Sequence, residues 1–75
     1  ALINTNENKD YIISRLISTD KEFFEFCALN GIKYGNKIAV KKQFKNSQMT
    51  QIIINTNTIV LNQDFTQIIY VNEIN

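Results

Sequence analysis

Two carboxylates and one thiol are the side chains whose types and spacing could support chemistry. Glu22 and Glu25 are three residues apart, which would put them on one helix face, where they could hold a cation or a water molecule. A solvated charged face is the favoured interpretation of that pair. The thiol of Cys27 falls on the apolar side of the same segment, and the chain has no histidine to activate it. The sequence therefore predicts no catalytic residue and a protein that is not an enzyme.

Five lysines and two aromatic residues gather in one stretch of the sequence. The lysines are Lys33, Lys37, Lys41, Lys42 and Lys45, and Tyr34 and Phe44 lie among them. Such a mixture could touch RNA, since stacking and charge act together on single strands. The favoured interpretation is a solvated strand face whose lysines protect an edge. Because the net charge is only +1, no direct nucleic acid contact is expected.

Length and composition indicate one small globular domain over residues 1–75. The chain is 44% hydrophobic and 20% charged, which suffices for one core but not two. One cysteine and no histidine exclude an intramolecular disulfide and the usual zinc ligands, so contact with another domain or subunit is expected to add stability. No membrane span or signal segment is predicted, and cysteine usage fits a cytoplasmic location. The sequence begins at Ala1 without methionine, so a fragment or processed chain and a free-standing protein are equally open.

A helix must carry the carboxylates and the thiol. Its predicted start has Thr19 capping the first turn while Glu22 reaches back to the Thr19 amide. The helical period predicts that Phe23, Phe26 and Cys27 point into the core and that Leu29 lies on the polar face. Leu29 is either a scattered surface residue or a partner contact.

Two glycines follow that helix, and both are interpreted as backbone geometry. Gly31 is predicted to end the helix in a left-handed conformation, with Ile32 returning to the core. Gly35 is predicted to be a turn residue with positive φ before the next strand. A phosphate-binding loop would precede a helix, so this pair of glycines does not form one.

Strands make up most of the remaining chain. Residues 1–9 are predicted to be a frayed lead-in, and 11–17 a first strand of low regularity. Alternation predicts a half-buried strand over 37–44 with Ile38, Val40 and Phe44 inward. Strands over 49–55, 58–62 and 68–74 follow, with turns at 45–48 and 56–58 and a helical turn at 63–67. The prediction is a mainly β fold, a small barrel of about five antiparallel strands with one helix between the first and second strands.

The order and spacing of these elements resemble a known family. The elements are Gly31-Ile32-Lys33-Tyr34-Gly35, Ile38 with Val40, Ile52 with Ile54, Ile59 with Leu61, and Ile69 with Val71. Together they resemble the FeoA-like, SH3-like barrel over about residues 9 to 72. The chain departs from the family pattern at Asn30-Gly31 and Tyr34-Gly35, where Leu-Gly and Pro-Gly are frequent, and at Thr66, where alanine is frequent.

The resemblance implies a function without catalysis. The aromatic helix looks more like the C-terminal domain of iron- or manganese-dependent repressors of the diphtheria toxin repressor type than like free-standing FeoA. This implies a regulatory interaction domain that packs against separate DNA-binding and dimerisation domains and modulates the metal response. Fe²⁺ or Mn²⁺ would then belong to the full-length protein, with no cofactor in this domain. The alternatives are a free-standing accessory protein that binds the cytoplasmic domain of a ferrous iron permease and, third, a small RNA-binding barrel.

The resemblance also suggests site residues. In some such repressors this domain lends a glutamate and a glutamine to an ancillary metal site, and the matching positions here are Asp20 and the apolar Phe23. Asp20 and Glu22 are thus the metal candidates, at a site that lacks one of its two side-chain ligands because Phe23 is apolar. An apolar groove of the SH3-like kind could hold a proline-rich or other peptide, with Leu29, Tyr34 and Phe44 as the predicted contacts.

Overall fold

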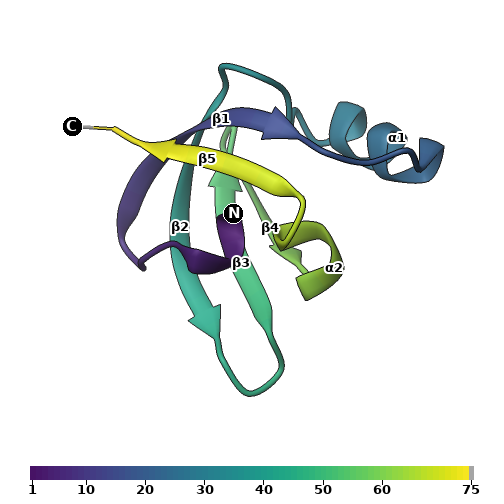
Figure 1. Cartoon of the computed structure of the whole chain (residues 1–75). Coiled ribbons are helices and arrows are strands. Elements are labelled where there is room, and N and C mark those ends of the chain that lie inside the picture. The colour runs from purple at the N-terminus through teal and green to yellow at the C-terminus, as the bar shows by residue number, and fades with distance from the viewer. Residues whose placement is uncertain (75) are drawn as a thin grey trace.

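Five antiparallel strands form one curved sheet in the order β4-β3-β2-β1-β5 (Figure 1). The computed structural model describes residues 1–74. The strands are β1 (Lys9–Leu16), β2 (Lys37–Phe44), β3 (Met49–Ile54), β4 (Asn57–Leu61) and β5 (Ile69–Glu73). The helix α1 (Lys21–Leu29) separates β1 from β2, a short α2 (Gln63–Thr66) separates β4 from β5, and the 3₁₀ turn η1 (Leu2–Asn4) opens the chain. This confirms the predicted mainly β class, with five antiparallel strands and a helix between the first two.

The core is filled by the apolar residues that alternate along the strands, together with one face of α1. Its buried members are Leu2, Tyr11, Ile13, Phe23, Cys27, Ile32, Ile38, Val40, Ile52, Ile54, Leu61 and Ile69. Phe26 lies half-buried against this core, and its ring packs 4.9 Å from that of Phe65 in α2. The inward positions predicted for Phe23 and Cys27 are confirmed, because an apolar stripe at helical spacing must face the sheet.

The start of α1 differs from the prediction. The cap is Asp20, whose carboxylate accepts a 3.0 Å hydrogen bond from the Glu22 amide, and the helix begins at Lys21. Glu22 is therefore the second helical residue, whereas the reciprocal capping arrangement requires a glutamate at the third. The predicted cap at Thr19 was wrong by one residue.

The end of α1 follows the sequence. The Ile32 amide donates a 2.9 Å hydrogen bond to the Cys27 carbonyl across Gly31, which has φ +73, and the Ile32 side chain is buried. This is the hydrogen bond of a Schellman motif, which ends a helix when a glycine in the left-handed conformation follows its last turn. Gly35 has φ +88 in the turn before β2, as predicted.

The first nine residues are not a frayed lead-in, contrary to the prediction. Leu2 is fully buried in the core, and the Thr5 hydroxyl donates to the Leu2 carbonyl at 2.7 Å. The Asn8 amide donates to the Val40 carbonyl at 2.7 Å, and Lys9 already pairs with Val40 as the first residue of β1. A buried leucine and a closed set of backbone bonds fix this segment against β2.

The β3–β4 connection is tighter than the sequence suggested. Asn55 and Thr56 both have positive φ, 50° and 69°, which makes a two-residue turn whose twist matches that of the flanking strands. β4 therefore starts at Asn57, inside the turn predicted at 56–58.

Candidate functional site

A bulge in β2 changes which side chains face inward near the end of that strand. The pairing of β2 with β3 shifts by one residue between Val40 and Lys42. The extra residue reverses the alternation that follows, so Gln43 takes the inward side and Phe44 the outward one. Phe44 is 41% exposed, which corrects the prediction that it points into the barrel.

Gln43 connects the β2–β3 hairpin to the N-terminal segment. Its side-chain amide donates to the carbonyl and the hydroxyl of Thr5 at 3.2 and 3.1 Å, and its side-chain carbonyl accepts a 2.7 Å hydrogen bond from the Thr50 hydroxyl. The backbone amide of Gln43 donates to the Glu7 carboxylate at 2.7 Å. Thr50 is buried, so this chain of bonds satisfies a hydroxyl that would be costly to leave unpaired.

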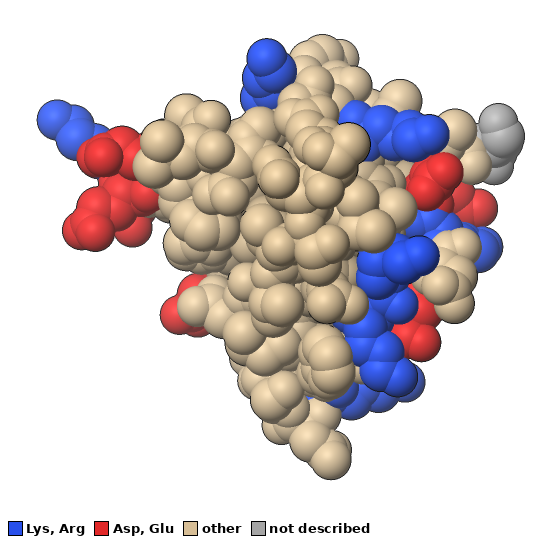
Figure 2. All heavy atoms as spheres, turned by 180° about the vertical axis from the view of Figure 1, so that it is seen from behind, with Lys and Arg blue, Asp and Glu red and all other residues tan. Residues whose placement is uncertain are grey.

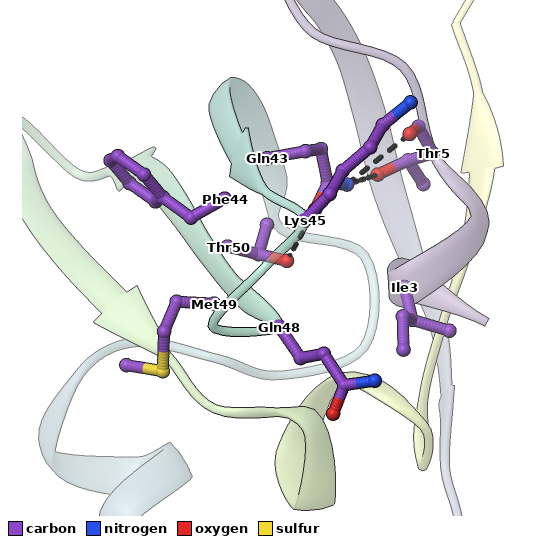
Figure 3. A pocket seen from close by; sticks show the side chains of 8 residues that line it. All are labelled: Ile3, Thr5, Gln43, Phe44, Lys45, Gln48, Met49 and Thr50. Atoms are coloured by element: carbon purple, nitrogen blue, oxygen red, sulfur yellow. Dashed lines mark hydrogen bonds between the residues drawn. The ribbon is translucent and has the colours of Figure 1, made fainter.

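A surface groove opens beside this network, and we call it the hairpin groove. It has a volume of about 300 Å³ and is lined by Ile3, Thr5, Gln43, Phe44, Lys45, Gln48, Met49 and Thr50. Figure 3 shows the hydrogen bonds that join Thr50 to Gln43 and Gln43 to Thr5 on one side of the hairpin. Phe44 and Met49 lie on the other side. Apolar side chains thus lie next to amide groups and one lysine, a combination suited to an extended peptide rather than to a buried small molecule.

The three predicted contact residues do not form one surface. Phe44 lines the hairpin groove, whereas Leu29 is the last residue of α1 and Tyr34 lies in the loop before β2. Leu29 and Tyr34 are 85% and 81% exposed. β2 runs from Lys37 to Phe44, so the loop that carries Tyr34 lies at the opposite end of this strand from Phe44. Figure 1 likewise places α1 well away from the loop of the β2–β3 hairpin.

The metal candidates lie at the start of α1, where both side chains are exposed. The Asp20 carboxylate is occupied as the helix cap, and its own amide donates to the Ser18 hydroxyl at 3.0 Å. Within residues 1–74, no three His, Cys, Asp or Glu side chains are grouped so that they could hold a metal ion. Two exposed carboxylates without a third ligand do not fit a self-contained site for Fe²⁺ or Mn²⁺.

The lysine-rich stretch is interleaved with acidic residues. Lys37 lies 3.6 Å from Asp10, Lys42 lies 3.9 Å from Glu7, and Lys9 lies 3.5 Å from Glu73, all as exposed pairs. Figure 2 shows Lys and Arg gathered along one flank, with Asp and Glu among them. Such mixed charge is typical of a solvated strand face.

Cys27 has the properties of a core residue. Its side chain is buried, and burial raises the pKa of the thiol to about 11. The thiol is therefore protonated at neutral pH, whereas a nucleophilic cysteine needs the thiolate. In the part of the chain that the structure describes, no helix has the length and apolar character required to cross a membrane.

The residues that build the hairpin groove were missed for two reasons. Thr5 and Ile3 fell in the supposed lead-in, although Leu2 is an apolar residue that a core could bury. Gln43 was missed because the bulge was not predicted, and with it the partner of Thr50, which shares the inward face of β3 with Ile52 and Ile54. The adjacent Lys41 and Lys42 interrupt the alternation of β2, and this interruption was the signal for an extra residue.

Comparison with known proteins gives matches to solved structures. No family model and no curated protein matches the sequence. ScaR with bound Zn²⁺ superposes with a TM-score of 0.85 at 26% identity, over 97% of this chain and 36% of that one. A manganese-dependent transcriptional repressor gives 0.90 at 19% identity, over 97% and 40% of the two chains. The iron uptake regulatory protein FeoA gives 0.82 at 11% identity, over 97% and 93%.

The manganese-activated repressor ScaR, the manganese-dependent repressor and FeoA share one architecture with this chain, although this chain spans well under half of each repressor. Each superposition covers 97% of this chain and so extends over nearly all of its strands and helices. These findings confirm the resemblance drawn from the glycines and the alternating strands: the chain has the FeoA-like, SH3-like barrel fold, which occurs both within metal-dependent repressors and in FeoA.

Proposed function

We propose that this chain is a regulatory interaction domain of a metal-dependent transcriptional repressor, which packs against separate DNA-binding and dimerisation domains in the cytoplasm. The observation that carries the proposal is the superposition on repressor structures with TM-scores of 0.85 and 0.90, in which the chain matches 36% and 40% of the repressor. The remainder of such a repressor would supply the DNA contacts and the principal metal sites.

The identity to ScaR is what supports the repressor setting. Identity to ScaR is 26%, against 11% to FeoA. The alternative function, as an accessory protein that binds the cytoplasmic domain of a ferrous iron permease, is supported by the match over 93% of FeoA. The third candidate, an RNA-binding barrel, receives no support from the mixed charge of the lysine-rich flank.

The domain would act through contacts rather than through chemistry. The hairpin groove offers apolar contact from Ile3, Phe44 and Met49, together with the exposed amide of Gln48 and the charge of Lys45. Such a surface fits an extended segment, for instance a proline-rich linker of the same protein or another domain of it. Leu29 and Tyr34 would belong to a second contact at the α1 end of the barrel.

Fe²⁺ or Mn²⁺ would be held elsewhere in the full-length protein. Asp20 and Glu22 are the only residues of this domain proposed to reach a metal, and they could serve only as additional ligands to an ion already bound by another domain. The domain would then modulate the metal response by its contacts with the rest of the repressor.

The mass of the native protein separates the two leading candidates. An antibody raised against this chain should detect, in the cells that make it, a polypeptide of more than twice the 8.7 kDa of the chain. A band near 8.7 kDa alone would overturn the repressor and favour the free-standing accessory protein. Copurification of that small band with a membrane permease would then identify its partner.

A further inference from the structure

The edge of the sheet formed by β4 has backbone groups without partners. β4 pairs with β3 alone, and the two-residue turn makes Ile54 and Asn57 a hydrogen-bonded pair. Alternation along the ladder then directs the N–H and C=O groups of Thr58 and Val60 to the open side. Among residues 1–74, no turn, loop or side chain bonds to these four groups.

The opposite edge of the sheet is formed by β5, and both η1 and α2 contact that strand. Glu73, near the end of β5, is also paired with Lys9 at 3.5 Å. On β4, Asn57 and Thr58 are exposed, and Val60 is 47% exposed. Figure 1 shows β4 beside β3, with α2 following it.

β4 also lacks the features that usually keep an edge strand from pairing. The 18 residues from 46 to 63 contain no charged residue and no proline. The β3–β4 register runs without a bulge, and Thr58, Ile59 and Val60 are all β-branched. Lysines, prolines and bulges are the common protections of an edge, and their joint absence leaves an edge ready to accept a strand. Figure 2 shows a broad uncharged area across the middle of the back of the molecule.

We propose that β4 pairs with β4 of a second copy of this chain, antiparallel, about a twofold axis at Ile59. In this register Thr58 of each copy faces Val60 of the other, and each such pair exchanges both hydrogen bonds. All four open groups of each copy are then satisfied, so the edge is complementary to itself. A second β4 is favoured as the occupant because it is uncharged and unpaired, whereas β1, β2 and β5 of this chain carry charges.

The association would be weak in the isolated chain. Five-residue strands meeting edge to edge cover far less than the roughly 1,600 Å² of a standard interface. Two chains already held together by other domains would pair more readily, because the second contact is then intramolecular.

Sedimentation equilibrium and ¹⁵N amide spectra of the chain, taken up to about 1 mM, test the proposal. We expect reversible dimerisation, with the concentration-dependent amide shifts centred on Thr58 and Val60. A chain that stays monomeric throughout this range would overturn the proposal, as would a dimer whose shifts map to another surface. Edge amides that move only on addition of a different polypeptide would replace the second copy with that partner.

Three variants separate edge pairing from a general effect of surface charge. Val60→Lys should lower the association constant by roughly tenfold or more, since it places a charge beside the paired strands. Thr58→Pro removes one outward donor at a place where an edge strand tolerates proline, and should also weaken the dimer. Gln51→Lys adds the same charge beside Val60 on β3, whose two edges are paired, and should leave the dimer intact. Equal losses in Gln51→Lys and Val60→Lys would contradict pairing through β4.

Discussion

The hydroxyl of Thr50 in β3 donates a 2.7 Å hydrogen bond to the side-chain carbonyl of Gln43 in β2. The same Gln43 side chain donates to Thr5, so a single amide joins the hairpin to the N-terminal segment. The β2 bulge makes this possible, because without it Gln43 would face outward. The hairpin groove therefore depends on the bulge and on the first residues of the chain.

Replacing Gln43 by alanine should lower the free energy of unfolding by about 1–3 kcal/mol, because it leaves the buried Thr50 hydroxyl without its acceptor. Urea melts of the chain measure this change. Gln48→Ala is the matched control, since Gln48 lines the same groove but is exposed and makes no side-chain hydrogen bond in the described part of the chain. We expect that control to stay within about 0.5 kcal/mol of the native chain. Equal effects of the two substitutions would show that the Thr50–Gln43 bond does not stabilise the fold.

Replacing Asp20 by alanine should cost about 0.5–2 kcal/mol, since it removes the cap on the Glu22 amide. Asp20→Asn keeps an acceptor and should cost less, and Thr19→Ala should change little. Thermal melts in the presence and absence of excess Mn²⁺ extend this comparison to the metal candidates. Mn²⁺ should leave the melting temperature of the isolated chain unchanged. A rise that Asp20→Asn abolishes would instead make Asp20 a ligand in its own domain.

Alanine at either glycine should destabilise the chain, and by similar amounts. Left-handed backbone costs a residue with a Cβ roughly 1–2 kcal/mol, and both glycines have positive φ. At Gly35 the added methyl group has open space, so we expect only that backbone cost. At Gly31 it would meet only the amide end of the exposed, flexible Asn55 side chain, which can turn away, so we expect a similar loss there. In a double-mutant cycle, Asn55→Ala should therefore leave the loss at Gly31 unchanged. A clearly larger loss at Gly31 that Asn55→Ala recovers would contradict this expectation.

The stability contributed by Cys27 should depend on pH in one direction. Burial raises the thiol pKa from 9.0 to about 11, so the protonated form is favoured in the folded chain. This contribution is fully present below pH 9.0 and is lost as the pH rises towards 11. Cys27→Ala, which does not titrate, is the reference for unfolding measured between pH 8 and 11. A chain whose stability falls no faster than that of Cys27→Ala over this range would contradict a buried, protonated thiol.

Sequence reasoning predicted the elements whose signals are local. The Gly31 closure, the inward face of Phe23 and Cys27, and the alternation of Ile52 and Ile54 follow from short-range geometry, and the structure shows all of them. The bulge after Val40 and the burial of Leu2 depend on contacts between distant parts of the chain. The hairpin groove is built from those two features, so only one of its residues, Phe44, was among the predicted contacts.

The metal dependence of DNA binding by the full-length protein tests the proposed regulatory role most directly. The measurement is the Mn²⁺ or Fe²⁺ concentration that gives half-maximal binding to the DNA preceding its own gene, compared between the complete protein and a version lacking this domain. We predict metal-dependent binding by both proteins, with different midpoints. Binding that ignores the metal, or midpoints that coincide, would contradict the proposal that this barrel regulates a metal-dependent repressor.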